Sequence, residues 1–278
     1  MNSGQDRNEV PAGAPYFLVD ALPAAGHFLL DGPEGRHASV VRRLRVGEVL
    51  VLSDGAGRLA AGGVTAVTRG GVDLQVGSGV EVAPPDLRIT VVQALPKGER
   101  SELAVELATE AGADAVVPWS AARCIARWTG EKTDKGVQRW QQVAREAAKQ
   151  SRRAFVPVVH SLANTSDITE LIERSDAALV LHEAGSAPLA GLHLPATGSL
   201  LLVVGPEGGI SPEELTAFRT AGAVVVRLGP EVLRTSTAAA VALGALGVLT
   251  SRWDSGARPA RCAPGNDETT SDETTSGT

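Results

Sequence analysis

The residues best suited to chemistry lie in VVGPEGGISPEEL, residues 203–215, where a glycine-rich loop carries one carboxylate. Gly208 and Gly209 can adopt backbone angles closed to other residues, and they let another molecule come close to the main chain. The loop lacks the Gly-Lys-Ser/Thr ending of a phosphate-binding loop, which argues against nucleoside triphosphate chemistry. Two readings remain: a ligand site that uses Glu207, or a tight strand-to-helix turn in which Glu207 has no special role.

The start of the helix after this loop is strongly encoded. Ser211 is a favoured N-cap residue, Pro212 is favoured at the first helical position, and Glu214 follows the serine by three residues. This spacing predicts a capping box, in which the serine and glutamate side chains satisfy each other's backbone N–H groups. The helix therefore begins directly after the glycine loop.

A second segment, LGPEVLRTSTAAAVALGAL at residues 228–246, repeats the order of strand, Gly-Pro turn and helix. Thr235, Ser236 and Thr237 are candidates to cap that helix. Arg234, just before it, needs an acidic partner, a phosphate or water. It is either part of a site or an ordinary surface arginine.

A third strand-like segment, LVLHEAG at residues 179–185, ends in His182 and Glu183. Ligands of open α/β sheets bind beyond the carboxyl ends of the strands. The three loops that begin at Leu181, Gly205 and Leu228 are therefore expected to line one pocket. His182 is either a base in that pocket or a hydrogen-bonded histidine at its rim.

Basic residues gather in two regions, 36–45 and 123–153, of an otherwise acidic chain whose net charge is −6. Between Arg123 and Arg153 there are nine Lys or Arg against three acids. Such local density is expected where a protein meets a phosphate backbone, although a charged run is also typical of a solvated face. The residues predicted to contact a phosphate backbone are Arg36, Arg42, Arg43, Arg45, Lys97, Arg100, Arg123, Arg127, Arg145, Arg152 and Arg153.

The elements that must position these residues fall into two domains. Residues 15–83 contain short apolar runs separated by glycine or acidic turns, which predicts a β module built of hairpins. After the prolines at 84 and 85, residues 86–253 alternate strand-length apolar runs with helical patterns, which is typical of an α/β sheet domain. Strands are expected at 88–95, 115–119, 154–159, 177–184, 199–205 and 223–229, and helices at 98–112, 137–150, 211–222 and 236–253.

Two of these helices carry packing signals. In the helix expected at 98–112, Leu103, Leu107 and Ala111 form an apolar stripe. The final helix is apolar nearly all round, so both of its sides need partners, either in the sheet or across a subunit interface.

The termini and the cysteines limit the remaining possibilities. Residues 1–14 and 254–278 read as disordered tails, and the second holds four acids and no base in its last 13 residues. Since no segment approaches the roughly 20 apolar residues that span a bilayer, we expect a soluble cytoplasmic protein without membrane contact. Cys124 and Cys262 lie far apart without Cys-x-x-Cys spacing, so we expect neither a metal site nor a disulfide.

The pieces HASVVRRLRVGE, QALPKGERSELAVELATEAGA, EAAKQSRR, VVGPEGGISPEEL and RLGPEVLRTSTAAAVALGAL occur in a recognisable order and spacing. With them the chain resembles the 16S ribosomal RNA uridine-N3 methyltransferases, a branch of the SPOUT superfamily that uses S-adenosylmethionine. The resemblance runs from about Tyr16 to Trp253. One departure is visible, because many relatives read R-A-E-T-A where residues 234–238 here read R-T-S-T-A, so that Ser236 replaces a glutamate.

The resemblance implies an α/β fold with a deep trefoil knot, preceded by a small PUA-like β-barrel that binds RNA, and a homodimer. It implies S-adenosylmethionine as cofactor and 16S rRNA of the small ribosomal subunit as substrate, methylated in its decoding region. The residues it assigns to the cofactor are Leu181, His182, Gly205, Pro206, Glu207, Gly208, Gly209, Leu228, Gly229, Val232, Leu233 and Thr237.

The reaction that the resemblance implies requires ring nitrogen 3 of uridine to lose its proton, because the protonated nitrogen is a poor nucleophile. A general base or positive charge near the uracil oxygens would favour that loss. Arg234 is the candidate for the second role, while the proton acceptor stays unassigned. Two alternatives remain open: a tRNA ribose methyltransferase of the same superfamily, and a non-catalytic RNA-binding or ribosome assembly protein.

Overall fold

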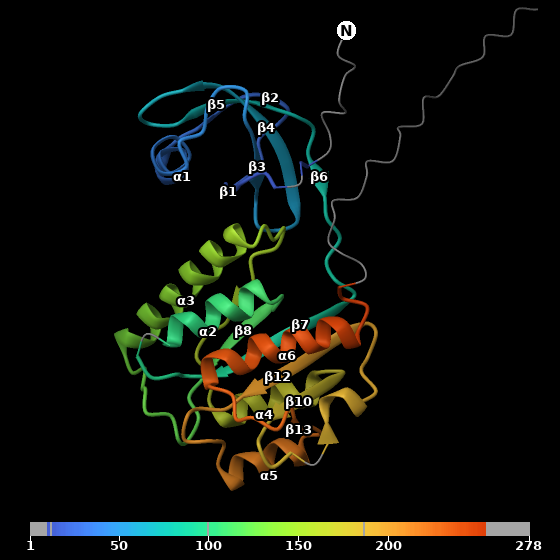
Figure 1. The fold of residues 1–278 in the computed structure, drawn as a ribbon. Helices are drawn as coiled ribbons and strands as arrows, with labels where there is room; N and C mark the ends of the chain where they lie inside the picture. Colours follow the sequence, from blue (N-terminus) through green and yellow to red (C-terminus); the bar gives the residue numbers. More distant parts are fainter. Residues whose placement is uncertain (1–9, 12, 99, 186, 254–278) are drawn as a thin grey trace, which may run out of the picture.

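The computed structural model describes residues 10–11, 13–98, 100–185 and 187–253, which form a β domain above a larger α/β domain (Figure 1). The predicted tails fall outside these residues at 1–9, 12 and 254–278. Ala14, assigned to the first tail, is only 8% exposed and packs with Val51 and Leu59. The β domain therefore begins slightly earlier than expected.

The β domain contains one six-stranded sheet in the order β1-β3-β4-β5-β2, with β6 paired to β4. Phe17, Leu50, Leu52 and Leu74 are among the side chains that fill its core. The strands are β1 (Tyr16–Leu18), β2 (Gly26–Leu30), β3 (Val49–Ser53), β4 (Arg58–Val67), β5 (Val72–Val76) and β6 (Val80–Glu81), and α1 (Gly32–Arg36) with a π-helical turn η1 (His37–Val41) follows β2.

The α/β domain is built on a seven-stranded sheet in the order β11-β13-β10-β12-β7-β8-β9, in which every pair is parallel. Such a sheet is buried on both faces, which explains the continuous apolar runs in the sequence. Its strands are β7 (Leu87–Ala94), β8 (Ala115–Trp119), β9 (Val158–Val159), β10 (Ala177–Leu181), β11 (Ala187–Pro188), β12 (Gly198–Val204) and β13 (Val224–Arg227).

The helices of this domain form two groups (Figure 1): α2 packs beside α3 and α6, and α4 packs beside α5. They are α2 (Arg100–Glu110), α3 (Glu131–Gln150), α4 (Thr165–Arg174), α5 (Pro212–Thr220) and α6 (Thr235–Leu249), and a short 3-10 turn η2 (Leu189–Gly191) follows β11. No helix in the described ranges has the length and apolar character needed to cross a membrane.

Several expectations about these elements are wrong in detail. Helix α4 was not expected, although Asn164 caps it through bonds from Ser166 N (2.8 Å) and Asp167 N (3.1 Å). The strand expected at 154–159 is reduced to Val158–Val159, and α3 begins six residues before its predicted start. On α2 the buried face is Ala104, Val105, Ala108 and Thr109, so Leu103 is 40% exposed.

Asp114 organises a buried ionic cluster beside the first residues of β7 and β8. Its carboxylate accepts hydrogen bonds from Ile89 N and Arg252 Nη1, both at 2.8 Å, and it lies 3.5 Å from Arg153 Nη2. Arg153 Nη1 also donates to two backbone carbonyl oxygens, those of residues 109 and 113. The cluster ties the C-terminal segment and the end of α3 to the start of β7.

The position of Arg153 corrects its assignment to the RNA-binding set. Its side chain is 16% exposed and its donors are used inside the protein. Burial lowers its pKa to about 10, although Asp114 opposes that shift. Arg153 is a structural residue, and its neighbour Arg152 is the exposed one.

Candidate active site

A cavity of about 830 Å³ opens where β10, β12 and β13 end. In register, Leu181 pairs with Val204 on one side and with Val226 on the other, so the three strands finish side by side. The predicted residues that line the cavity are Leu181, His182, Gly205, Pro206, Glu207, Gly208, Gly209, Leu228, Gly229, Val232, Leu233 and Arg234, together with Arg100 and Arg123. The prediction that three strand ends share one pocket is confirmed.

The glycines of the loop after β12 are required by its shape. Gly209 has φ +73°, and its N–H donates to the Pro206 carbonyl at 2.9 Å. A Cβ on Gly205 would lie 2.6 Å from Cγ1 of Ile210, and one on Gly208 would lie 3.1 Å from Arg123 Cβ. The loop therefore exposes main chain at the cavity because no side chain fits there.

Two contacts hold this loop to neighbouring segments. Glu207 Oε1 accepts a hydrogen bond from the Lys97 backbone N–H at 3.2 Å. Arg123 Nη1 donates to the Gly208 carbonyl at 3.3 Å. Glu207 thus ties the loop after β12 to the loop after β7, so its carboxylate has a structural role in the glycine-rich loop.

The predicted capping box is present at the start of α5. Ser211 Oγ accepts from Glu214 N at 3.2 Å, and Glu214 Oε2 accepts from Ser211 N at 3.0 Å. The sequence did not reveal that Glu214, 5% exposed, also accepts from Ala122 N (2.8 Å) and Thr165 Oγ1 (3.0 Å) through Oε1. One buried carboxylate therefore joins the cavity loop to α4 and to the segment after β8.

Replacing Glu214 with alanine is expected to lower the free energy of unfolding by about 2–3 kcal/mol, because the buried N–H of Ser211 and the N–H of Ala122 lose their acceptor. Urea denaturation measures the effect. Glu213→Ala, an exposed change in the same first turn, is the matched control and should change stability by less than about 1 kcal/mol. Equal midpoints for the two variants would contradict the bridging role.

The N-terminus of α6 borders the cavity in an unexpected way. Its N-cap is Arg234, and no side chain caps it, so the capping expected from Thr235, Ser236 or Thr237 is wrong. Thr237 turns its hydroxyl to the Arg234 carbonyl (3.2 Å) and does not line the cavity, although it was assigned to the cofactor. The first N–H groups of α6 have no side-chain acceptor within the described residues.

Arg234 itself is exposed at the cavity. Within the described part of the chain its guanidinium makes no hydrogen bond or ion pair with another side chain, and only its carbonyl is used, by Thr237 N and Ala238 N. A free guanidinium beside a glycine-walled cavity is available to an oxygen-rich ligand.

His182 has a structural task in the loop after β10. Its backbone N–H donates to the Val226 carbonyl at 3.0 Å, and its ring Nδ1 accepts from the Ala184 backbone N–H at 3.1 Å. A neutral ring whose Nδ1 accepts carries its proton on Nε2 and has no free nitrogen to accept another. The geometry therefore favours a hydrogen-bonded histidine at the rim of the cavity over a catalytic base.

Sequence reasoning missed other lining residues, among them Arg219 on α5, Arg227 at the end of β13, and Glu231. Arg227 is the last residue of a strand that was recognised, so the strand-end rule could have found it. Within the described residues no group of three or more His, Cys, Asp or Glu side chains is arranged to hold a metal ion.

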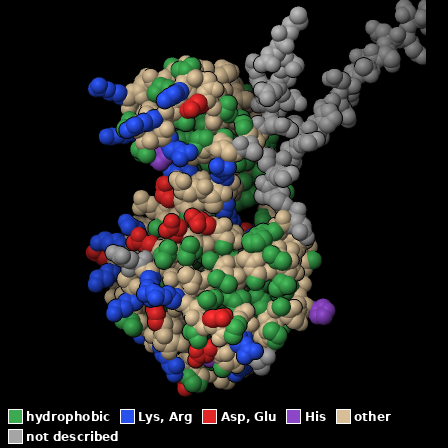
Figure 2. All heavy atoms as spheres, viewed as in Figure 1, with side chains coloured by type: hydrophobic (Ala, Val, Ile, Leu, Met, Phe, Trp, Pro, Cys, Tyr) green, Lys and Arg blue, Asp and Glu red, His purple; other side chains and the backbone are tan. Residues whose placement is uncertain are grey.

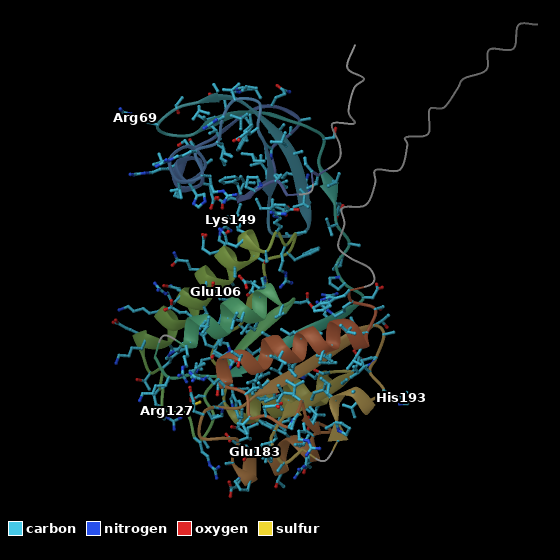
Figure 3. All side chains as sticks on the ribbon, in the orientation of Figure 1. Arg69, Glu106, Arg127, Lys149, Glu183 and His193 are labelled. Atoms are coloured by element: carbon cyan, nitrogen blue, oxygen red, sulfur yellow. The ribbon has the colours of Figure 1, made fainter. Side chains whose placement is uncertain are left out.

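The predicted RNA-binding residues other than Arg153 are spread over both domains. Figure 2 shows Lys and Arg side chains gathered on one side of the β domain and continuing along the same side of the α/β domain. Arg127, labelled in Figure 3, is exposed but donates to the carbonyls of Ala121 (3.2 Å) and Ala122 (3.0 Å), which braces the segment after β8. Arg145 is half-buried, whereas Lys97, Arg100 and the four arginines between 36 and 45 are exposed.

Comparison with known proteins gives consistent matches for both domains. The RNA methyltransferase domain family matches residues 83–247, and the RNA methyltransferase PUA domain family matches residues 30–77. The chain is 56% identical over 249 residues to ribosomal RNA small subunit methyltransferase E of Mycobacterium bovis, covering 88% of this chain and 95% of that protein. The Bacillus subtilis protein of the same name is 30% identical over 246 residues, covering 84% and 96%.

Two solved structures have the same architecture and contain S-adenosylmethionine. A methyltransferase of Legionella pneumophila matches with a TM-score of 0.75 and 28% identity over 85% of this chain and 98% of that one. Ribosomal RNA small subunit methyltransferase E of Neisseria gonorrhoeae matches with a TM-score of 0.75 and 26% identity over the same shares. The chain therefore belongs to the RNA methyltransferase family whose members are named ribosomal RNA small subunit methyltransferase E.

Proposed function

We propose that this chain is an enzyme that uses S-adenosylmethionine to methylate ring nitrogen 3 of one uridine in the decoding region of 16S rRNA, on the small ribosomal subunit in the cytoplasm. The observation that carries the proposal is the cavity where β10, β12 and β13 end, with glycine-walled loops and the free guanidinium of Arg234 at its edge. Membership of the methyltransferase family supports the substrate class.

The cavity suits the cofactor in size and lining. Its volume of about 830 Å³ lies within the roughly 300–1,000 Å³ of ligand pockets. Leu181 and Leu228 offer apolar surface, while the glycines leave backbone groups accessible. Bound S-adenosylmethionine would supply an activated methyl group on its sulfonium.

The protein must make the uridine nitrogen reactive. Arg234 would stand beside the uracil oxygens, where its positive charge stabilises the deprotonated ring. The Asp and Glu side chains nearest to Arg234 in sequence do not pair with it in the described structure, so its charge remains available. Holding donor and acceptor in line contributes further to the rate.

The exposed basic residues of both domains would hold the RNA around this site. Contacts to phosphates position a nucleic acid without reading its sequence. A uridine that is stacked or paired in the folded RNA must turn out of the stack to enter the cavity. The β domain would then bind the RNA backbone on either side of that uridine.

The test combines a purified and a cellular measurement. Calorimetric titration should detect S-adenosylmethionine binding, and the protein should transfer a methyl group to small subunits from cells that lack it. Mapping should find one unmethylated uridine in the 16S rRNA of those cells. An unchanged map would overturn the substrate, modification of tRNA ribose would favour the transfer-RNA alternative, and failure to bind cofactor would favour the non-catalytic one.

We further propose that the enzyme is a homodimer that uses the outer face of α6 and α2. Figure 2 shows hydrophobic side chains gathered over this region. Val241 is 48% exposed, Val248 74% and Leu103 40%. Large apolar side chains exposed together on neighbouring helices are unusual in a monomeric protein and mark an interaction surface. Sedimentation velocity should therefore give the mass of two chains, and a monomer at micromolar concentration would contradict the proposal.

The finer topology is also a proposal. Closure of the six-stranded sheet would make the β domain a PUA-like barrel, and the C-terminal segment would form a deep trefoil knot. True knots are rare in proteins, and this proposal makes the α/β domain one of the exceptions.

A further inference from the structure

A second cavity, of about 140 Å³, lies where the β domain meets the end of α3. This is roughly ten times the volume that one water molecule needs. Its walls include Tyr16 from β1, His37 and Arg42 from the turn η1, and Lys149 and Arg152 from the end of α3. Figure 3 labels Lys149 at this junction. The cavity is therefore lined mainly by groups that can donate hydrogen bonds.

An unusual backbone turn presents two of these groups. Arg42 N donates to the His37 carbonyl at 2.8 Å, an i to i+5 bond of the π-helical kind. Single π turns occur frequently at functional sites. The His37 ring packs edge-on against Phe17, with centroids 5.8 Å apart. His37 and Arg42 are thus brought together at the wall of the cavity.

Arg152 also has an unusual backbone. Its φ is +57°, and among the described non-glycine residues only Arg43 shares a positive value. The bonds from Arg152 N to Lys149 O (3.2 Å) and from Arg153 N to Ala148 O (2.8 Å) close α3 in the pattern that normally places glycine at this position. A non-glycine residue in this left-handed conformation costs backbone free energy, so the arginine side chain is expected to have a role of its own.

The charges around the cavity are unequally balanced. Lys149 Nζ lies 2.9 Å from Glu34 Oε1 and 2.7 Å from Glu146 Oε2. Burial favours a lower pKa for Lys149, but the two carboxylates outweigh it and the pKa is raised, so the ammonium is charged and compensated. In the described ranges Arg42 and Arg152 have no ion pair and no side-chain hydrogen bond.

Tyr16 adds a hydroxyl close to the guanidinium of Arg152. Burial raises the pKa of Tyr16, and the positive charge of Arg152 opposes that rise, which reflects their proximity. Two uncompensated guanidinium groups, a phenol and an imidazole therefore converge on one small polar cavity. Guanidinium groups bind phosphate oxygens with two parallel hydrogen bonds.

We infer that this junction cavity binds one phosphate of the RNA backbone, clamped between Arg42 of the β domain and Arg152, just after α3. That the RNA is small-subunit rRNA rests on the proposed function. The clamp would fix how the RNA runs from the β domain to the active site, since phosphate contacts set register and orientation.

The competing explanation is structural. Cations near the C-terminus of a helix stabilise it through the helix dipole, and Arg152 lies two residues after the last residue of α3, Gln150. The two explanations predict opposite results for Arg152→Gly. Glycine suits the left-handed backbone, so the change should leave the fold intact while removing the guanidinium.

The experiment uses the full chain carrying Arg152→Gly or Arg42→Gln, with Arg174→Gln as the matched control. Arg174 lies on α4 and is 76% exposed, so its replacement removes one charge from a distant surface. Binding to transcribed 16S rRNA is measured against salt concentration, together with melting temperature, S-adenosylmethionine binding, and KM and kcat on unmethylated small subunits.

For Arg152→Gly we expect a melting temperature that is unchanged or about 2–4 °C higher. RNA affinity should fall several-fold, the salt slope should decrease by about one, and KM should rise while kcat at saturation stays unchanged. Arg42→Gln should weaken RNA binding similarly, and Arg174→Gln should not. Unchanged affinity and slope in Arg152→Gly, or a lower melting temperature as its only effect, would overturn the clamp. If wild-type protein binds RNA but methylates none, the proposed function fails while the binding data still decide the clamp.

Discussion

Replacing Arg234 with alanine is expected to reduce methyl transfer by about 100- to 1,000-fold, the usual cost of removing one donor that stabilises developing charge. Arg234 is exposed, its guanidinium forms no hydrogen bond or ion pair within the described residues, and it contributes only backbone to the start of α6. The fold and cofactor affinity should therefore survive. Single-turnover transfer to unmethylated small subunits measures the loss.

Two comparisons make the Arg234 result interpretable. Arg234→Lys keeps the charge but lacks the planar fork, so its rate should lie between those of wild type and alanine. If the charge stabilises the deprotonated uridine, the alanine variant should recover part of its rate at higher pH, where the base loses its proton without help. Wild-type turnover by the alanine variant would remove Arg234 from the site.

Replacing Asp114 with alanine is expected to lower the free energy of unfolding by about 3–5 kcal/mol, the cost of breaking a buried ion pair from one side. The change leaves the guanidinium groups of Arg153 and Arg252, with side chains only 16% and 10% exposed, without their counter-charge. Urea denaturation followed by circular dichroism measures the loss.

The matched control is Glu170→Ala, which breaks the exposed pair between Glu170 and Arg174. Exposed pairs contribute about 0–1 kcal/mol, so this variant should unfold close to wild type. If Asp114→Ala unfolds no earlier than Glu170→Ala, the buried cluster does not stabilise the domain.

Local signals explain what could be predicted from the sequence. The capping box of Ser211 and Glu214 depends only on residues three apart, and the observed bonds match it. The apolar runs at β7, β10 and β12 are long because a parallel sheet is covered on both faces. A strand followed by a glycine turn fixes where each loop begins, so the cavity-lining loops were identified without knowing the strand order.

Other expectations failed because neighbours in space decided them. Leu103 belongs to an apolar stripe, yet α2 buries a face centred on Ala104 and Ala108 because α6 and α3 pack there. Thr235 and Ser236 are good capping residues, yet they are buried and α6 starts without a side-chain cap. Periodicity and composition cannot report which face a partner helix will cover.

The sequence by itself determined the two-domain order, most of the strands and the loops that line the cavity, because backbone preferences and short-range pairs encode them. Only the tertiary structure decided which charges are available. Arg152 and Arg153 are adjacent and identical in type, but one faces the junction cavity and the other binds Asp114 in the interior. The reason is physical: a charge acts according to its burial and its partners, and the side-chain partners of Arg153 come from residues 39 to 44 positions away.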